Sequence, residues 1–82
     1  MLKISIEQVT TQATPDPDAP EGAKTFRLNE QGIDVIIDFY DSETIHVFCI
    51  DWMLYERSKM VQTLSHAVNY VNQFLKTASY QK

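Results

Sequence analysis

The stretch that decides the fold is residues 33–50, IDVIIDFYDSETIHVFCI. Two apolar runs flank a short polar segment, which is typical of two β-strands joined by a tight turn. Successive side chains of a strand point to opposite faces, and a turn over residues 41–43 gathers the apolar side chains of both strands on one face. We therefore predict an antiparallel hairpin with one face turned to a core. Its core-side pairs are Phe39 with Ile45, Ile37 with Val47, and Val35 with Cys49.

The opposite face of this hairpin is half apolar. The same register places Asp38 beside His46 and leaves several apolar side chains around that pair. A sheet with one face in water usually alternates cleanly between apolar and polar residues. The surface is therefore either ordinary exposed β-propensity or a contact surface for another protein chain. Its apolar members are Ile36, Tyr40, Phe48 and Ile50.

Length and composition describe one small domain. The chain has 82 residues, 44% hydrophobic and 22% charged, and such a chain buries roughly 60–65% of its unfolded surface. No apolar run approaches the roughly 20 residues that a bilayer-spanning helix needs, and the N-terminus lacks the apolar centre of a signal peptide. A single cysteine excludes an internal disulfide and suits a reducing compartment. We expect one domain over residues 1–82, located in the cytoplasm.

Charge is divided unevenly along the chain. Residues 1–56 carry 3 basic and 11 acidic side chains, whereas residues 57–82 carry 4 basic and no acidic ones, for a total of −4. The simplest interpretation is that an acidic sheet and a basic helix attract each other within one fold. The basic residues form no dense patch, so we do not expect nucleic acid as a partner.

Two further strands are expected before the central hairpin. Residues 2–9 alternate apolar and polar side chains and predict a first strand, and residues 24–29 predict a second. A four-residue loop over residues 29–32, ending in a glycine that can adopt positive φ, pairs Leu28 with Ile33.

Residues 10–23 predict a flexible loop, because they contain all three prolines and no large apolar side chain. Loops of this length in a small domain are often mobile or functional. The segment is either a crossover between strands or a binding loop in which Asp16, Asp18 and Glu21 meet a basic partner. It lacks the glycine-centred spacing of an EF-hand.

Residues 51–56, DWMLYE, are compatible with the end of a strand, a turn, or the start of a helix. Asp51 and Ser58 are competing candidates for the N-cap of that helix. Trp52 and Tyr55 are large amphipathic side chains, and we expect them to seal the sheet edge where the helix begins.

Residues 58–78 follow a helical pattern, with apolar residues at steps of three and four and no proline or glycine. The outer face is polar but nearly uncharged, so it is either simply solvated or docks through His66, Tyr70 and Gln73. We predict an α+β fold: a four-stranded antiparallel sheet in the order ββββα, with one C-terminal helix packed on one face.

Little catalytic or metal-binding chemistry is available. Cys49 belongs to the core-facing set, where cysteines are usually inert, and it points away from His46. With two histidines, one cysteine and no glycine-rich phosphate loop, we expect no metal and no cofactor. Asp38 beside His46 is either a cross-strand charge pair or an oriented general base.

We therefore expect a small non-enzymatic protein-interaction module that uses the second sheet face. Its partner is expected to be a second copy, forming a homodimer, or a larger protein that it binds or inhibits, and not a membrane. The alternative is a small enzyme or ligand-binding domain that uses Asp38 and His46 near the long loop. The expected contact residues are Ile36, Tyr40, Phe48, Ile50, Asp38, His46, Trp52 and Tyr55.

Overall fold

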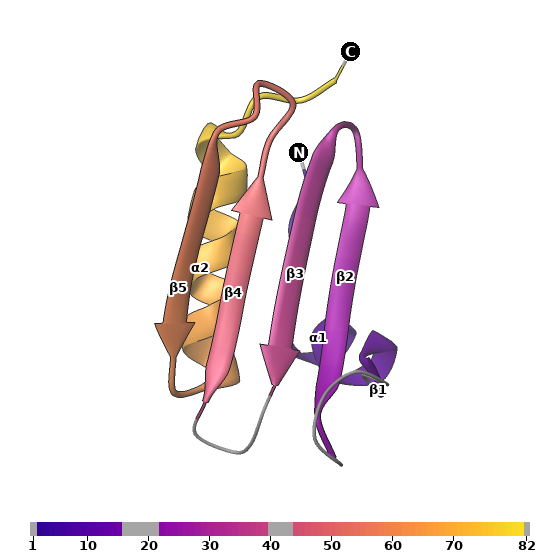
Figure 1. Cartoon of the computed structure of the whole chain (residues 1–82). Coiled ribbons are helices and arrows are strands. Elements are labelled where there is room, and N and C mark those ends of the chain that lie inside the picture. Colours follow the sequence, from indigo (N-terminus) through magenta and orange to yellow (C-terminus); the bar gives the residue numbers. More distant parts are fainter. Residues whose placement is uncertain (1, 16–21, 40–43, 82) are drawn as a thin grey trace.

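The computed structural model describes residues 2–15, 22–39 and 44–81. Within them, a five-stranded antiparallel sheet in the order β1-β2-β3-β4-β5 lies against a layer formed by two helices (Figure 1). The elements are α1 (Ile6–Gln12), β1 (Thr14–Pro15), β2 (Lys24–Glu30), β3 (Ile33–Phe39), β4 (Ile45–Ile50), β5 (Glu56–Val61) and α2 (Leu64–Thr77). The α+β class and the C-terminal helix are confirmed, but the predicted count of four strands is wrong.

The central hairpin, β3 and β4, has the predicted register. Val35 pairs with Cys49, Ile37 with Val47, and Asp38 with His46 on the opposite face. Burial alternates along both strands. A shift by one residue would turn every buried side chain of a strand to the other face, so the register is strongly specified. The expected turn at residues 41–43 lies outside the described residues.

The β2–β3 hairpin has a shorter loop than predicted. Leu28 pairs with Val35 instead of Ile33, and Ile33 pairs with Glu30. The two loop residues, Gln31 and Gly32, have φ values of 54° and 80°. Two consecutive residues with positive φ give a turn whose twist matches that of the flanking strands. The pairing differs by two residues, so each side chain keeps its predicted face.

The predicted first strand over residues 2–9 is wrong, because helix α1 begins at Ile6. The Ser5 side chain accepts a hydrogen bond from the Gln8 backbone N–H at 3.1 Å and caps this helix. Before the helix, Ile4 is buried, and its backbone N–H and C=O both bond to the Asn72 side chain at 2.9 Å. A side chain of α2 thus supplies the hydrogen bonds that a neighbouring strand would have supplied.

The predicted loop over residues 10–23 is only partly a loop. Its first residues complete α1, and the short strand β1 follows, with Thr14 pairing with Thr25 of β2. The acidic residues proposed for binding, Asp16, Asp18 and Glu21, lie outside the described residues.

The predicted helix over residues 58–78 begins too early. Strand β5 occupies its first part, and α2 starts at Leu64 with Thr63 as its N-cap, which accepts a bond from the His66 N–H at 3.1 Å. Neither Asp51 nor Ser58 caps a helix. Only Val61 of β5 is buried. The sequence of this strand, ERSKMV, therefore lacks the alternation of apolar and polar residues that predicts a strand.

The core lies between the sheet and the helical layer. Helix α2 packs on β4 and β5, and α1 packs on β2, so both helices cover the same face (Figure 1). None of the helices in the described ranges is long and apolar enough to cross a membrane. The buried residues of α2 are Ala67, Val68, Val71, Phe74 and Leu75.

Candidate interaction surface

The sheet face opposite the helices, here called the open face, is covered by no described helix. Cross-strand pairing arranges its side chains in three rows from β2 to β5. The central row is Arg27, Ile36, Phe48 and Ser58; the row nearer the β4–β5 turn is Asn29, Asp34, Ile50 and Glu56; and the third row is Thr25, Asp38, His46 and Met60.

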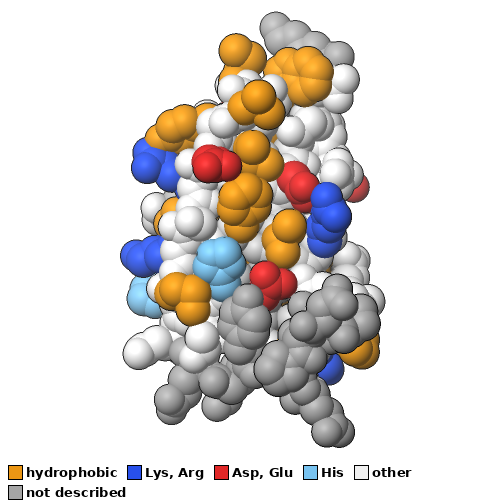
Figure 2. Space-filling model, in the orientation of Figure 1, with side chains coloured by type: hydrophobic (Ala, Val, Ile, Leu, Met, Phe, Trp, Pro, Cys, Tyr) orange, Lys and Arg blue, Asp and Glu red, His pale blue; other side chains and the backbone are white. Residues whose placement is uncertain are grey.

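Hydrophobic side chains lie together at the centre of the open face. Ile36 is directly opposite Phe48, and Ile50 follows two residues later on the same strand and face as Phe48. All three are half-buried by their neighbours. Figure 2 shows apolar side chains at the centre of this face, with acidic, basic and histidine side chains around them. Tyr40, the fourth expected member, lies outside the described residues.

Arg27 and Asp34 form a two-pronged ion pair beside this cluster. Arg27 Nε donates to Asp34 Oδ1 at 3.1 Å, and its terminal nitrogen NH2 donates to Oδ2 at 2.9 Å. The hydrogen bonds and the attraction of the carboxylate raise the pKa of Arg27 above its ordinary value. The pair holds the guanidinium at the border of the cluster, next to Ile36.

Asp38 and His46 are cross-strand partners on the open face, as predicted. His46 Nδ1 lies 4.0 Å from Asp38 Oδ2, while the Thr25 hydroxyl donates to Asp38 Oδ1 at 2.7 Å. Ser58, expected as the N-cap of a helix, instead lies on β5 and on the same open face. It is opposite Phe48, two residues from the Met60 that pairs with His46. No hydrogen bond joins Ser58 to His46 in the described structure, whereas a nucleophile and its base usually lie within about 3.2 Å.

The β4–β5 turn carries an exposed apolar cluster. Trp52 and Tyr55, expected to seal the sheet edge at the start of the helix, lie in this turn and are each 50% exposed. Met53 and Leu54 between them are 70% and 77% exposed. The Trp52 indole lies so close to Gly32 that a Cβ there would come within 2.9 Å of its ring. The turn is therefore fixed against the β2–β3 hairpin.

Asp51 organises this turn from a buried position. Its Oδ1 accepts the backbone N–H groups of Met53 at 2.9 Å and Tyr55 at 3.0 Å, and its Oδ2 accepts that of Ser79 at 3.1 Å. Burial alone would raise the pKa of Asp51, but the bonds from Ser79, Tyr55 and Met53 outweigh it and hold the pKa below the ordinary value. The carboxylate thus joins the turn to the segment after α2.

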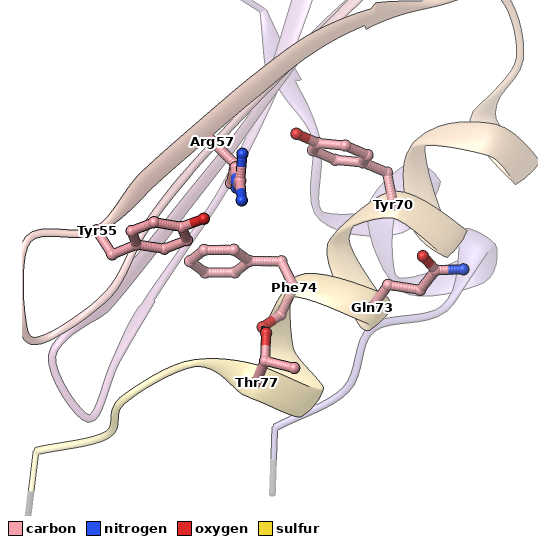
Figure 3. A pocket seen from close by; sticks show the side chains of 6 residues that line it. All are labelled: Tyr55, Arg57, Tyr70, Gln73, Phe74 and Thr77. Carbon is pink, nitrogen blue, oxygen red and sulfur yellow. The ribbon is translucent and has the colours of Figure 1, made fainter.

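A groove between β5 and α2 was missed by the sequence analysis. Arg57 and Tyr55 face side chains of α2 across a cavity of about 290 Å³ (Figure 3). The Arg57 guanidinium carbon lies 4.7 Å from the centroid of the Tyr55 ring, and the buried Phe74 contributes to the wall. Arg57 and Lys59 are two residues apart, a spacing that places both on one face of a strand. The apolar pattern of residues 58–78 instead favours a helix over this segment. The cavity is lined by Tyr55, Arg57, Tyr70, Gln73, Phe74 and Thr77.

Cys49 lies fully buried in the core, and burial raises the pKa of its thiol to about 12. Among the residues that the structure describes, no three His, Cys, Asp or Glu side chains are grouped so that they could hold a metal ion. Comparisons with protein-family models, with curated proteins and with solved structures found no match for this chain.

Proposed function

We propose that the protein is a small non-enzymatic interaction module that associates with a second copy of itself through the open face. The observation that supports this proposal is the cluster of Ile36, Phe48 and Ile50 at the centre of that face. Contiguous apolar side chains with a polar border are typical of protein-binding surfaces.

The central position of the cluster on the open face favours a second copy as the partner. Arg27 and Asp34 neutralise each other in their two-pronged ion pair, and Asp38, His46 and Glu56 stand on the other sides of the cluster. A two-fold axis brings the same surface against itself, so the apolar cluster of one copy would cover that of the other. Two sheets packed face to face interdigitate their side chains at a separation of about 10 Å.

The test is the solution mass of a Phe48→Asp variant. A carboxylate at the centre of the interface would be desolvated without a partner, so we expect this variant to be monomeric where the wild type associates. Ser65→Asp is the matched control, because it adds the same charge at an exposed site on α2 and should retain the wild-type mass.

Far-UV circular dichroism establishes that each variant is folded. Ile36→Lys offers a second disruption of the same cluster if Phe48→Asp does not fold. Association that persists in both folded variants contradicts the proposal, and so does a wild-type chain that is monomeric at every concentration.

A further inference from the structure

Strand β5 is an open edge of the sheet, since within the described residues it pairs only with β4. The Asp51 N–H donates to the Tyr55 C=O at 3.1 Å, so these two residues form a hydrogen-bonded pair at the start of the β4–β5 ladder. Hydrogen-bonded pairs recur at every second residue of an antiparallel ladder, so the odd-numbered residues of β5 bond to β4. Backbone N–H and C=O groups therefore point away from the sheet at Glu56, Ser58 and Met60.

The side chains beside this edge are basic and aromatic. Arg57 and Lys59 are exposed and lie on the helix side of β5, where Lys59 Nζ is 5.9 Å from the centroid of the Tyr70 ring. A second cavity of about 170 Å³ lies next to Lys59. Its lining includes Tyr70 and Gln73, which also line the cavity next to Arg57. The two cavities thus form one groove along β5, and residues 57–82 contain no acidic side chain.

A second copy of β5 is a poor occupant of this edge. If the β5 strands of two copies paired antiparallel, with Ser58 opposite Ser58, Arg57 of each copy would lie opposite Lys59 of the other. Like charges directly opposite each other destabilise a strand pair, and basic side chains commonly protect sheet edges from self-pairing. The charge at the edge therefore favours a partner of opposite sign.

The chain's own acidic run, residues 16–21, is also a poor occupant. Prolines stand at two of its six positions, and a proline has no N–H to donate to an edge strand.

We propose that the groove between β5 and α2 binds an extended acidic segment of another protein, which pairs antiparallel with β5 as a sixth strand. Edge strands bind peptides in this way, with backbone bonds for affinity and alternate side chains for specificity. The two ligand residues opposite Arg57 and Lys59 are two apart in the ligand sequence, and their side chains face α2. The ligand therefore carries carboxylates at alternate positions. Its remaining side chains lie on the open face beside Glu56 and are not acidic.

The test is fluorescence anisotropy with a labelled peptide in which Glu alternates with Val and Thr. We expect saturable binding that weakens with added salt, and weaker binding of a control peptide of the same composition with its Glu residues adjacent. Arg57→Glu should weaken binding by about tenfold or more, because the repulsion replaces an attraction. Lys76→Glu is the matched control, an equal charge change at an exposed residue of α2 outside the groove, and should bind like the wild type.

Backbone pairing is tested separately with the same peptide N-methylated at the residue opposite Ser58. This peptide should bind much more weakly, since it cannot donate to the edge. Absence of binding by the wild type, equal losses in Arg57→Glu and Lys76→Glu, or undiminished binding of the N-methylated peptide would each overturn the proposal. Phe48→Asp should bind the peptide normally, so the groove and the open face are tested independently.

Discussion

Replacing Asp51 with alanine should destabilise the fold more than its place in a surface turn suggests. Asp51 is 5% exposed, and its carboxylate accepts three backbone N–H groups, from Met53, Tyr55 and Ser79. Two of these bonds close the β4–β5 turn, and the third holds the chain after α2 against it. Asp51→Ala leaves all three donors without their acceptor.

The expected loss is about 3 kcal/mol of unfolding free energy, taking about 1 kcal/mol for each of the three bonds. Bonds to a charged acceptor are often worth more, but water can reach part of this exposed turn and replace them, so the lower figure applies. Small domains have total stabilities of about 5–15 kcal/mol, so the loss is a large share. With a urea dependence of about 1 kcal/mol per molar, the midpoint should fall by about 3 M.

Urea unfolding followed by circular dichroism measures this change, and Asp51→Asn is the graded control. The asparagine oxygen can still accept from Met53 and Tyr55, but its amide nitrogen cannot accept from Ser79. We expect Asp51→Asn to lose about 1 kcal/mol, one bond of the three. A loss below about 0.5 kcal/mol in Asp51→Ala, within the range of ordinary surface substitutions, would refute the reasoning.

Three further predictions follow from single residues. The pKa of Asp51 in the folded protein lies below its ordinary value of 3.8. The charged carboxylate therefore stabilises the fold fully above the pKa of the unfolded chain, and this stabilisation is lost as the pH falls through the pKa of the folded protein. The free energy of unfolding should therefore fall less steeply with acid in Asp51→Asn than in the wild type. Leu54 has a φ of 64°, so Leu54→Gly should raise the unfolding free energy by about 0.5–1 kcal/mol, whereas Met53→Gly should lower it. Cys49 should resist thiol-specific labelling in the native protein and react in denaturant, and rapid native labelling would contradict its burial.

The central hairpin could be predicted because buried apolar residues occupy every second position along β3 and β4. Val35, Ile37, Val47 and Cys49 reach one core, and any odd shift would expose them. The open face follows from the same register, which is why the neighbours Ile36 and Phe48 could be foreseen. The β2–β3 loop was misjudged because Gln31 is not a residue that signals positive φ.

The segments at residues 2–9 and 56–61 could not be read from periodicity. Residues 2–9 alternate like a strand, but Ser5 and Gln8 form the spacing of a helix capping box, a local signal that the alternation concealed. Strand β5 is exposed along nearly its whole length, and Leu54 occupies a turn position where glycine is usual. The groove beside α2 depends on β5, so it could not be predicted once β5 was missed.

The most direct test of the central claim is the mass of the wild-type protein measured by light scattering across a concentration series. Association through the open face predicts a rise toward twice the chain mass of 9.5 kDa, with Phe48→Asp remaining at the single-chain mass. A wild-type mass of 9.5 kDa at every concentration would contradict it.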